Sequence, residues 1–271
     1  MTIQELIGPH PVSPHIFGDW WSSEDLPATE TKKHRALGEI DGVRERAIDK
    51  LAQWLVDYHL TRIKRLSIEQ MRKILERNDL VKHIDQLNIL PLSDKTRKGN
   101  LGEIMLIEYL KESRGFDSII PKLHYNPNIN QSMKGDDVLL FNPNNWEEEV
   151  IYGECKYRGT PSKRTIDEII NNLDGSRRFP VSITFVANCL YNKGETELAL
   201  RILQIHLKVI NGEIPLTNVG FLISSHTTKN QVERHLSSTN SRLVMISLGV
   251  DNPQQIVDKA YSKADAILKT I

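Results

Sequence analysis

The chain has 271 residues, a length that suits one large domain or a main domain with a smaller appendage. Apolar residues make up 39% and charged residues 26%, which provides for a packed core and a polar surface and excludes a disordered or collagen-like chain. Lys plus Arg and Asp plus Glu each number 35, so the formal charge of zero excludes a generally basic coat for nucleic acid but not a local basic groove.

The sequence carries no sign of export or membrane insertion. No apolar run approaches 18 residues, and the N-terminus lacks the charged start and apolar stretch of a secretory signal. The two cysteines, Cys155 and Cys189, lie in apolar runs typical of strands, and their positions show no zinc-binding spacing. We therefore expect a cytoplasmic protein with two buried thiols and no membrane contact.

Residues 1–95 are expected to form a helical N-terminal region that packs on the remaining chain or docks a partner. Prolines make the first 35 residues irregular, and the Trp20-Trp21 pair supplies an apolar anchor that we expect to be buried within the monomer. Apolar residues at helical spacing over 40–55 predict one helix, and Ser67 with Gln70 as a capping box predicts the start of a second. A short polar linker is expected over 91–100.

The chain from residue 96 to 271 is expected to form an α/β domain. The predicted elements are, in order, helix 100–113, strands 118–124, 136–141 and 149–156, helix 165–174, strand 181–187, helix 195–210, strand 219–224, helix 228–237, strand 243–248 and helix 253–269. This alternation predicts a mixed sheet flanked by helices.

Two charged clusters fall on neighbouring predicted strands. Along a strand, side chains alternate, so Glu154 and Lys156 share one face of theirs. If the two strands form a hairpin through the Asn/Pro-rich turn at 142–145, Asp137 lies opposite Glu154. Two carboxylates about 5 Å apart repel each other unless a cation lies between them.

This arrangement predicts a divalent metal site. Asp137 and Glu154 offer hard oxygen ligands, and the backbone carbonyl of Cys155 can add a third, a donor set that suits Mg²⁺ or Mn²⁺. Such an ion activates a bound water and polarises a phosphoryl oxygen, while Lys156 orients the water or offsets charge on phosphorus. The residues therefore favour phosphodiester hydrolysis.

The same residues resemble the PD-(D/E)xK nuclease superfamily of restriction-endonuclease-like enzymes. Asp137 opens the second core strand, Glu154-x-Lys156 lies on the third, and the predicted order across 100–187 matches the family's αβββαβ core. Asp136 stands where the family has proline and is a rival ligand. The resemblance also implies a glutamate from the first core helix, for which Glu103 is the candidate. Glu108 competes with it, and Asn100 with Glu103 also reads as a capping box.

More narrowly, the chain resembles the HamA family of Hachiman anti-phage defence systems. The likeness rests on the segment Thr96-Arg97-Lys98-Gly99-Asn100-Leu101-Gly102-Glu103 together with Gly135-Asp136-Asp137 and Gly153-Glu154-Cys155-Lys156. It implies a metal-dependent DNA nuclease effector, with 96–271 as the nuclease domain. It also implies a helicase-like ATPase partner of the HamB type that restrains the nuclease until infection or DNA damage.

Basic residues near the predicted site suggest a rim that holds DNA phosphates. The candidates are Arg97, Lys98, Arg158, Lys163 and Arg164. The alternative for each is an ordinary charge on a solvated loop.

Two other functions remain open from the sequence. The first is a non-catalytic module that binds DNA or a helicase and uses the charged cluster as an internal salt bridge. The second is a resolvase-like nuclease of repair or recombination. The chain has no P-loop, dinucleotide-binding, zinc-protease or serine-hydrolase motif, so any ATP dependence must come from a partner.

Overall fold

The structure is a computed structural model and describes residues 1–76, 89–120, 122–125, 130, 137–175 and 181–271. Its helices are α1 (Ile3–Ile7), α2 (Ile16–Trp20), α3 (Arg44–His59), α4 (Arg62–Glu76), α5 (Asp94–Arg114), the 3-10 helix η2 (Lys122–Tyr125), α6 (Lys163–Gly175), α7 (Val181–Asn192), α8 (Thr196–Ile210), α9 (Thr228–His235) and α10 (Pro253–Thr270). Its strands are β1 (Trp21–Asp25), β2 (His34–Glu39), β3 (Val138–Phe141), β4 (Val150–Tyr157), β5 (Leu216–Ser224) and β6 (Leu243–Gly249).

The strands of the described part of the chain form one six-stranded sheet in the order β1-β2-β6-β5-β4-β3. The four central strands run parallel, and an antiparallel strand pairs at each edge. Parallel strands are buried on both faces, which explains why β5 and β6 read as nearly continuous apolar runs. The expected α/β class and mixed sheet are thus confirmed.

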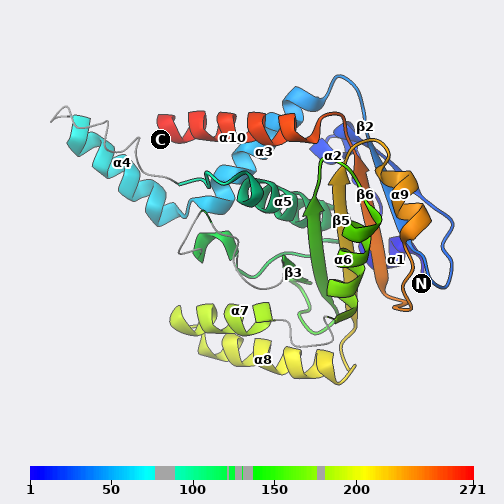
Figure 1. Cartoon of the computed structure of the whole chain (residues 1–271). Coiled ribbons are helices and arrows are strands. Elements are labelled where there is room, and N and C mark those ends of the chain that lie inside the picture. Colours follow the sequence, from blue (N-terminus) through cyan, green and yellow to red (C-terminus); the bar gives the residue numbers. More distant parts are fainter. Residues whose placement is uncertain (77–88, 121, 126–129, 131–136, 176–180) are drawn as a thin grey trace.

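Helices cover both faces of this sheet (Figure 1). α3, α5 and α10 pack on one face in a core shared with Cys155 and Phe221. α6 and α9 pack on the other face in a smaller core that includes Tyr152 and Leu222. The α7–α8 hairpin adds a third cluster beside Phe141 and Val150 of the β3–β4 hairpin. Residues on alternate positions of β4 therefore point to α5 and to α6, as the strand period requires.

The N-terminal region differs from the helical expectation because it contributes β1 and β2 to the sheet. β2 pairs with β6 in parallel, so residues early and late in the chain lie side by side. Trp20 and Trp21 are buried in the main core, which confirms their burial within the monomer. The prolines of this region mark breaks between short elements rather than a long irregular stretch. The division of the chain at residue 95 stays a prediction, and the main core contains residues from both sides of it.

Three helix starts differ from their predicted positions. α4 begins at Arg62, where the Thr61 hydroxyl accepts a hydrogen bond from the Lys64 N–H, so the Ser67 cap is wrong. α5 begins at Asp94, so the expected linker over 91–100 is mostly helix. α6 begins at Lys163 with Ser162 accepting from the Thr165 N–H. At α4 and α6 a hydroxyl residue upstream of the predicted position caps the helix, a choice that sequence spacing alone does not decide.

Two predicted strands are wrong, so the αβββαβ order expected across 100–187 is not found among the described residues. Among described residues of 118–124 the chain forms η2, and an isolated bridge joins Asp117 to Phe141. That stretch includes Pro121 in the sequence, and proline has no N–H for a sheet ladder. Residues 181–187 begin the helix α7, which packs on α8 and carries Cys189. A short apolar run does not distinguish a buried strand from a buried helix.

Candidate functional site

The predicted β3–β4 hairpin brings Asp137 beside Glu154. Val138 pairs with Gly153 and Leu139 with Tyr152, so the next pair in this register is Asp137 with Glu154. The predicted register is therefore confirmed. Asp137 lies directly before the first residue of the edge strand β3.

The Asp137 carboxylate is fixed by the backbone of β4. Its Oδ2 accepts a hydrogen bond of 2.9 Å from the Cys155 N–H, which extends the hairpin ladder with a side chain. Because the N–H and C=O of a strand residue point to the same edge, the Cys155 carbonyl also faces the side on which Asp137 lies. Burial, followed by the nearby Glu103 carboxylate, raises the pKa of Asp137 to about 6.

Glu154 points to the α6 face of the sheet and is 6% exposed. Its Oε1 accepts a hydrogen bond of 2.8 Å from the Asn172 amide on α6 and is ion-paired with the Lys156 ammonium. Burial and the neighbouring Asp137 raise the pKa of Glu154. Burial opposes the charge on Lys156, but the Glu154 carboxylate outweighs it and raises the lysine's pKa.

Glu103 reaches the same cluster from α5. It is 7% exposed, and its Oε2 lies 3.0 Å from the Lys122 Nζ. Burial raises the pKa of Glu103, although Lys122 opposes the shift. Asn100 and Glu103 lie inside α5 rather than at its start, so the capping-box alternative for this pair is wrong.

A close approach of α5 to β4 makes this placement of Glu103 possible. A Cβ on Gly102 would lie 2.5 Å from the Cys155 Sγ, and one on Gly153 would lie 2.8 Å from a methyl group of Leu106. Both positions therefore require glycine for the helix to touch the strand. In each of the pairs Gly102-Glu103 and Gly153-Glu154, the glycine allows the helix and the strand to touch, and the glutamate next to it belongs to the acidic cluster.

The rival ligands are placed differently. Glu108 accepts a hydrogen bond of 2.7 Å from the Tyr58 hydroxyl and lies 3.4 Å from the Lys111 ammonium. It is therefore Glu103, and not Glu108, whose charge acts on Asp137. Asp136 lies outside the described residues. Lys122 and Asn172 were missed by sequence reasoning because no motif or regular spacing links them to the acidic residues.

The predicted basic rim divides into two kinds of residue. The Arg97 guanidinium donates to the Pro91 carbonyl and lies over the Tyr261 ring, which ties it to the core. Lys98 pairs with Asp94 in the first turn of α5. Arg158 lies 3.7 Å from Glu168, whereas Lys163 and Arg164 are exposed at the start of α6.

The donor set fits a divalent cation chemically. The two neighbouring carboxylates and the Cys155 carbonyl are hard oxygen donors of the kind that Mg²⁺ and Mn²⁺ prefer. Within the described residues, no three His, Cys, Asp or Glu side chains are gathered closely enough to hold a metal ion together. Asp137 and Glu154 with the backbone carbonyl are therefore the ligands available in this arrangement, and Glu103 is ion-paired with Lys122.

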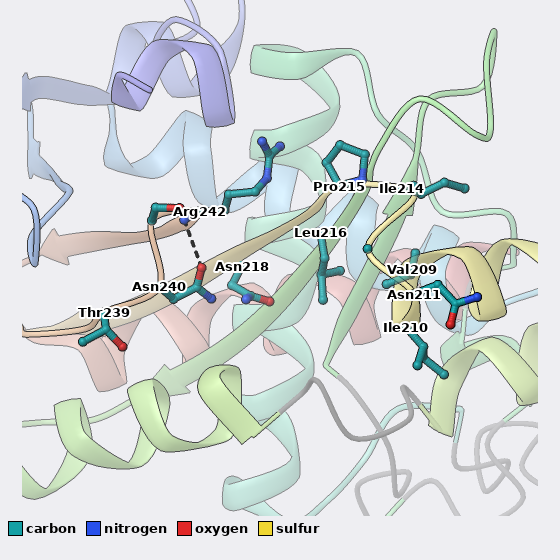
Figure 2. Close-up of a pocket in the computed structure, with 12 residues that line it drawn as sticks. Val209, Ile210, Asn211, Ile214, Pro215, Leu216, Asn218, Thr239, Asn240 and Arg242 are labelled. Atoms are coloured by element: carbon teal, nitrogen blue, oxygen red, sulfur yellow. Dashed lines mark hydrogen bonds between the residues drawn. The ribbon is translucent and has the colours of Figure 1, made fainter.

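A pocket in another part of the described structure lies away from these residues. It has a volume of about 490 Å³ and opens at the N-terminal ends of β5 and β6, where Leu216, Asn218 and Asn240 line it (Figure 2). The Asn240 side chain there accepts a hydrogen bond from the Arg242 N–H. None of the predicted site residues lines this pocket, so its size does not bear on the carboxylate cluster.

A second constellation has the geometry of a nucleophilic triad. The His34 Nε2 lies 2.7 Å from the Ser247 Oγ, and its Nδ1 lies 2.6 Å from the Glu233 Oε1. Ser247 is 0% exposed and His34 1% exposed, so a substrate has no access to the hydroxyl. We interpret this group as a structural link between β2, β6 and α9 rather than an active site.

The fold and the site together define an α/β protein with a partly buried carboxylate–lysine cluster at one edge of a mixed sheet. The family model of HamA matches residues 14–264. The Hachiman protein HamA of Bacillus cereus is 41% identical over 269 residues, which cover 99% of this chain and 97% of the relative. The chain therefore belongs to the HamA family, and the resemblance that the sequence motifs indicated is confirmed.

The described part of the chain contains no helix with the length and apolar character needed to cross a membrane. Both cysteines are free and buried, as expected, although Cys189 lies on a helix rather than a strand.

Proposed function

We propose that this HamA-family chain is a divalent-metal-dependent nuclease that hydrolyses phosphodiester bonds in DNA during anti-phage defence. The observation that carries the proposal is the neighbouring pair Asp137 and Glu154 with the Lys156 ammonium on Glu154. A buried carboxylate beside a half-buried one is costly without a cation, and clusters of groups with raised pKa values are common at functional sites. We also propose that α5, β3, β4 and α6 form a restriction-endonuclease-like core, which among the described residues lacks the strands expected over 118–124 and 181–187.

Each residue has a role that its position supports. Asp137 and Glu154 would hold the cation, with the Cys155 carbonyl as a third oxygen. The bound ion would polarise a phosphoryl oxygen and lower the pKa of a coordinated water. Lys156 stays protonated beside Glu154 and is placed to hold the attacking water or a phosphate oxygen by a hydrogen bond. Asn172 orients Glu154 from α6.

Lys163 and Arg164 supply the proposed DNA contact. Both are exposed at the start of α6, the helix that also carries Asn172. Cations on that helix would hold phosphates near Glu154 without reading bases. We further propose that a helicase-like ATPase partner restrains the nuclease until infection.

A non-catalytic binding module is the second candidate, and the absence of a three-ligand cluster among the described residues favours it. Against it, the partners of Asp137 and Glu154 in the described structure are the Cys155 N–H, Lys156 and Asn172. An arginine fork, which would neutralise a carboxylate permanently, is not among those described partners.

DNA cleavage by the purified chain tests the proposal. We expect cleavage that requires Mg²⁺ or Mn²⁺, that EDTA abolishes, and that Glu154→Gln and Lys156→Met each reduce by about a hundredfold or more. Glu148→Gln, which changes an exposed glutamate of the same hairpin, is the matched control and should cleave normally. Because a restrained effector is inert until released, the same variants should also be compared for toxicity in cells that express the chain. Equal cleavage or toxicity in the wild type and both site variants would contradict the proposal and favour the binding module.

A further inference from the structure

Lys122 is a second half-buried cation in the carboxylate cluster and has no role in the proposed chemistry. It begins η2, and its side chain is 16% exposed. Its Nζ lies 3.0 Å from the Glu103 Oε2 and donates to the backbone carbonyl of Asp137 at 3.4 Å. One ammonium group therefore bridges α5 and the start of β3.

Both of these oxygens beside the Lys122 ammonium are of the kind that a divalent cation would take. A carboxylate oxygen and a backbone carbonyl oxygen are both hard donors. A lysine ammonium is a compact point charge, so it satisfies such oxygens electrostatically much as a metal ion does. Lys122 thus occupies two oxygen atoms that could otherwise serve a cation, one of them on Asp137 itself.

The charge balance of the cluster shows how the Lys122 ammonium weakens the attraction of the site for a metal ion. Glu103, Asp137 and Glu154 bring three negative charges, and Lys122 and Lys156 bring two positive charges, which leaves one negative charge for an incoming dication. Removing one ammonium would leave two, which matches a dication. Like charges a few ångströms apart in a buried site repel strongly.

Of the two lysines, Lys122 is the one that can withdraw. Lys156 is a residue of β4, and its ammonium pairs with a carboxylate two positions away on the same strand. Lys122 belongs to a short 3-10 helix outside the sheet. A small pocket of about 40 Å³ adjoins it; its lining is mainly apolar, and Lys122, Asp137 and Ser118 are its polar residues. Lys122 is therefore held less firmly by the fold than Lys156 is.

We propose that the Lys122 ammonium and the divalent cation compete for the Glu103 carboxylate. Lys122 holds Glu103 away from the other two carboxylates, and Glu103 becomes a metal ligand when Lys122 leaves it. This inference rests on the proposed function, because it concerns the same metal site. It assigns Lys122 as an internal brake on metal binding rather than as a catalytic residue.

Binding of Mn²⁺ to the full chain, measured by the electron paramagnetic resonance signal of the free ion, tests this competition without any activity measurement. Lys122→Met, which keeps the length of the side chain, and Lys122→Gln, which keeps a hydrogen-bond donor, should each bind Mn²⁺ at least about tenfold more tightly than the wild type. Lys111→Met is the matched control, since Lys111 pairs with Glu108 on the same helix as Glu103 and should leave the affinity unchanged. Circular dichroism melting confirms that each variant is folded.

A double-mutant cycle locates the effect. In the Glu103→Gln background the carboxylate for which the two cations compete is gone, so Lys122→Met should no longer increase the affinity. A wild type that binds Mn²⁺ while both Lys122 variants bind no more tightly would overturn the competition and leave the metal site standing. Failure of every variant and the wild type to bind Mn²⁺ would overturn the metal site itself, and the competition with it.

Discussion

The Asp137 carboxylate accepts a hydrogen bond from the Cys155 backbone N–H, 2.9 Å away. In an ordinary antiparallel ladder this N–H would be met by a backbone carbonyl of the neighbouring strand. Here the edge strand β3 does not extend as far as Cys155, and the Asp137 side chain accepts this hydrogen bond in place of a backbone carbonyl. The result is that Asp137 is aimed along β4 at the level of Glu154, with its orientation set by backbone rather than by a flexible partner.

Asn172 should act as a positioning residue for Glu154. Its amide donates to the Glu154 Oε1 at 2.8 Å, and hydrogen bonds to metal ligands from outside the coordination sphere typically matter for affinity. We expect Asn172→Ala to weaken Mn²⁺ binding and slow DNA cleavage by about tenfold each. Asn171→Ala, at an exposed neighbouring position of α6, should change neither quantity. Equal behaviour of the two variants would remove Asn172 from the site.

Gly102 should be essential for the contact between α5 and β4. A methyl group there would lie 2.5 Å from the Cys155 Sγ, inside any allowed contact distance. We expect Gly102→Ala to lower the free energy of unfolding by about 1–3 kcal/mol, despite the better helix propensity of alanine. Chemical denaturation measures the change.

A second substitution checks the cause of the Gly102 effect. Cys155→Ala removes the sulfur atom, so the Gly102→Ala/Cys155→Ala double variant should recover part of the loss. Gly159→Ala, where nothing lies within 4 Å of the new methyl group, serves as the control. An unchanged free energy of unfolding in Gly102→Ala would show that the helix does not lie so close.

His59 should make the protein less stable in acid. Its Nδ1–H donates to the Leu55 carbonyl, and its Nε2 accepts from the Asn100 amide, which fixes the neutral ring. Burial, together with the nearby His124 and Lys64, lowers the pKa of His59 to about 4. His59 takes up a proton near pH 6.5 in the unfolded chain but only near pH 4 in the folded protein. The neutral ring therefore contributes its full share to the free energy of unfolding above pH 6.5, and this share is lost as the pH falls toward 4.

The size of the His59 effect follows from the same shift. The free energy of unfolding should fall by on the order of 3 kcal/mol between pH 6.5 and 4 because of this one group. Unfolding free energies of the wild type and His59→Gln over this range give the contribution as a difference. Parallel curves for the two proteins would contradict a neutral, buried His59.

Lys163 and Arg164 should bind DNA phosphates, whereas Arg97 should not. We expect Lys163→Ala/Arg164→Ala to weaken DNA binding at every sequence and to reduce the slope of log affinity against log salt by about two. Fluorescence anisotropy at several salt concentrations measures both. Arg97→Ala should lower the melting temperature instead, because its guanidinium lies on the Pro91 carbonyl and the Tyr261 ring. A salt slope reduced by Arg97→Ala alone would reverse this assignment.

The part of the site that depends on local geometry, the β3–β4 hairpin, was predictable from the sequence. The Asn/Pro turn fixes the hairpin, and strand alternation then places Asp137, Glu154 and Lys156 together. Contacts that depend on the packing of distant segments were not predictable. Lys122 lies on a 3-10 helix with no periodic pattern, and β2 joins the sheet through pairing with β6, more than two hundred residues later.

The errors in secondary structure have a common cause. The β-branched run at 181–187 fits a strand by propensity, but tertiary contacts of α7 with α8 select the helix. The opposite holds for His34–Leu37, where a polar and mixed sequence becomes a buried strand because it lies between β1 and β6. Local preference is a weak guide wherever burial is decided by a partner element far away in the chain.

The position of a bound ion tests the central proposal most directly. Crystals of the full chain soaked in Mn²⁺ should give an anomalous difference peak about 2.1 Å from a carboxylate oxygen of both Asp137 and Glu154. The same peak should be missing in Asp137→Asn crystals that keep the β3–β4 register. A wild-type crystal in which the peak is absent, or lies away from these two carboxylates, would contradict the proposed metal centre.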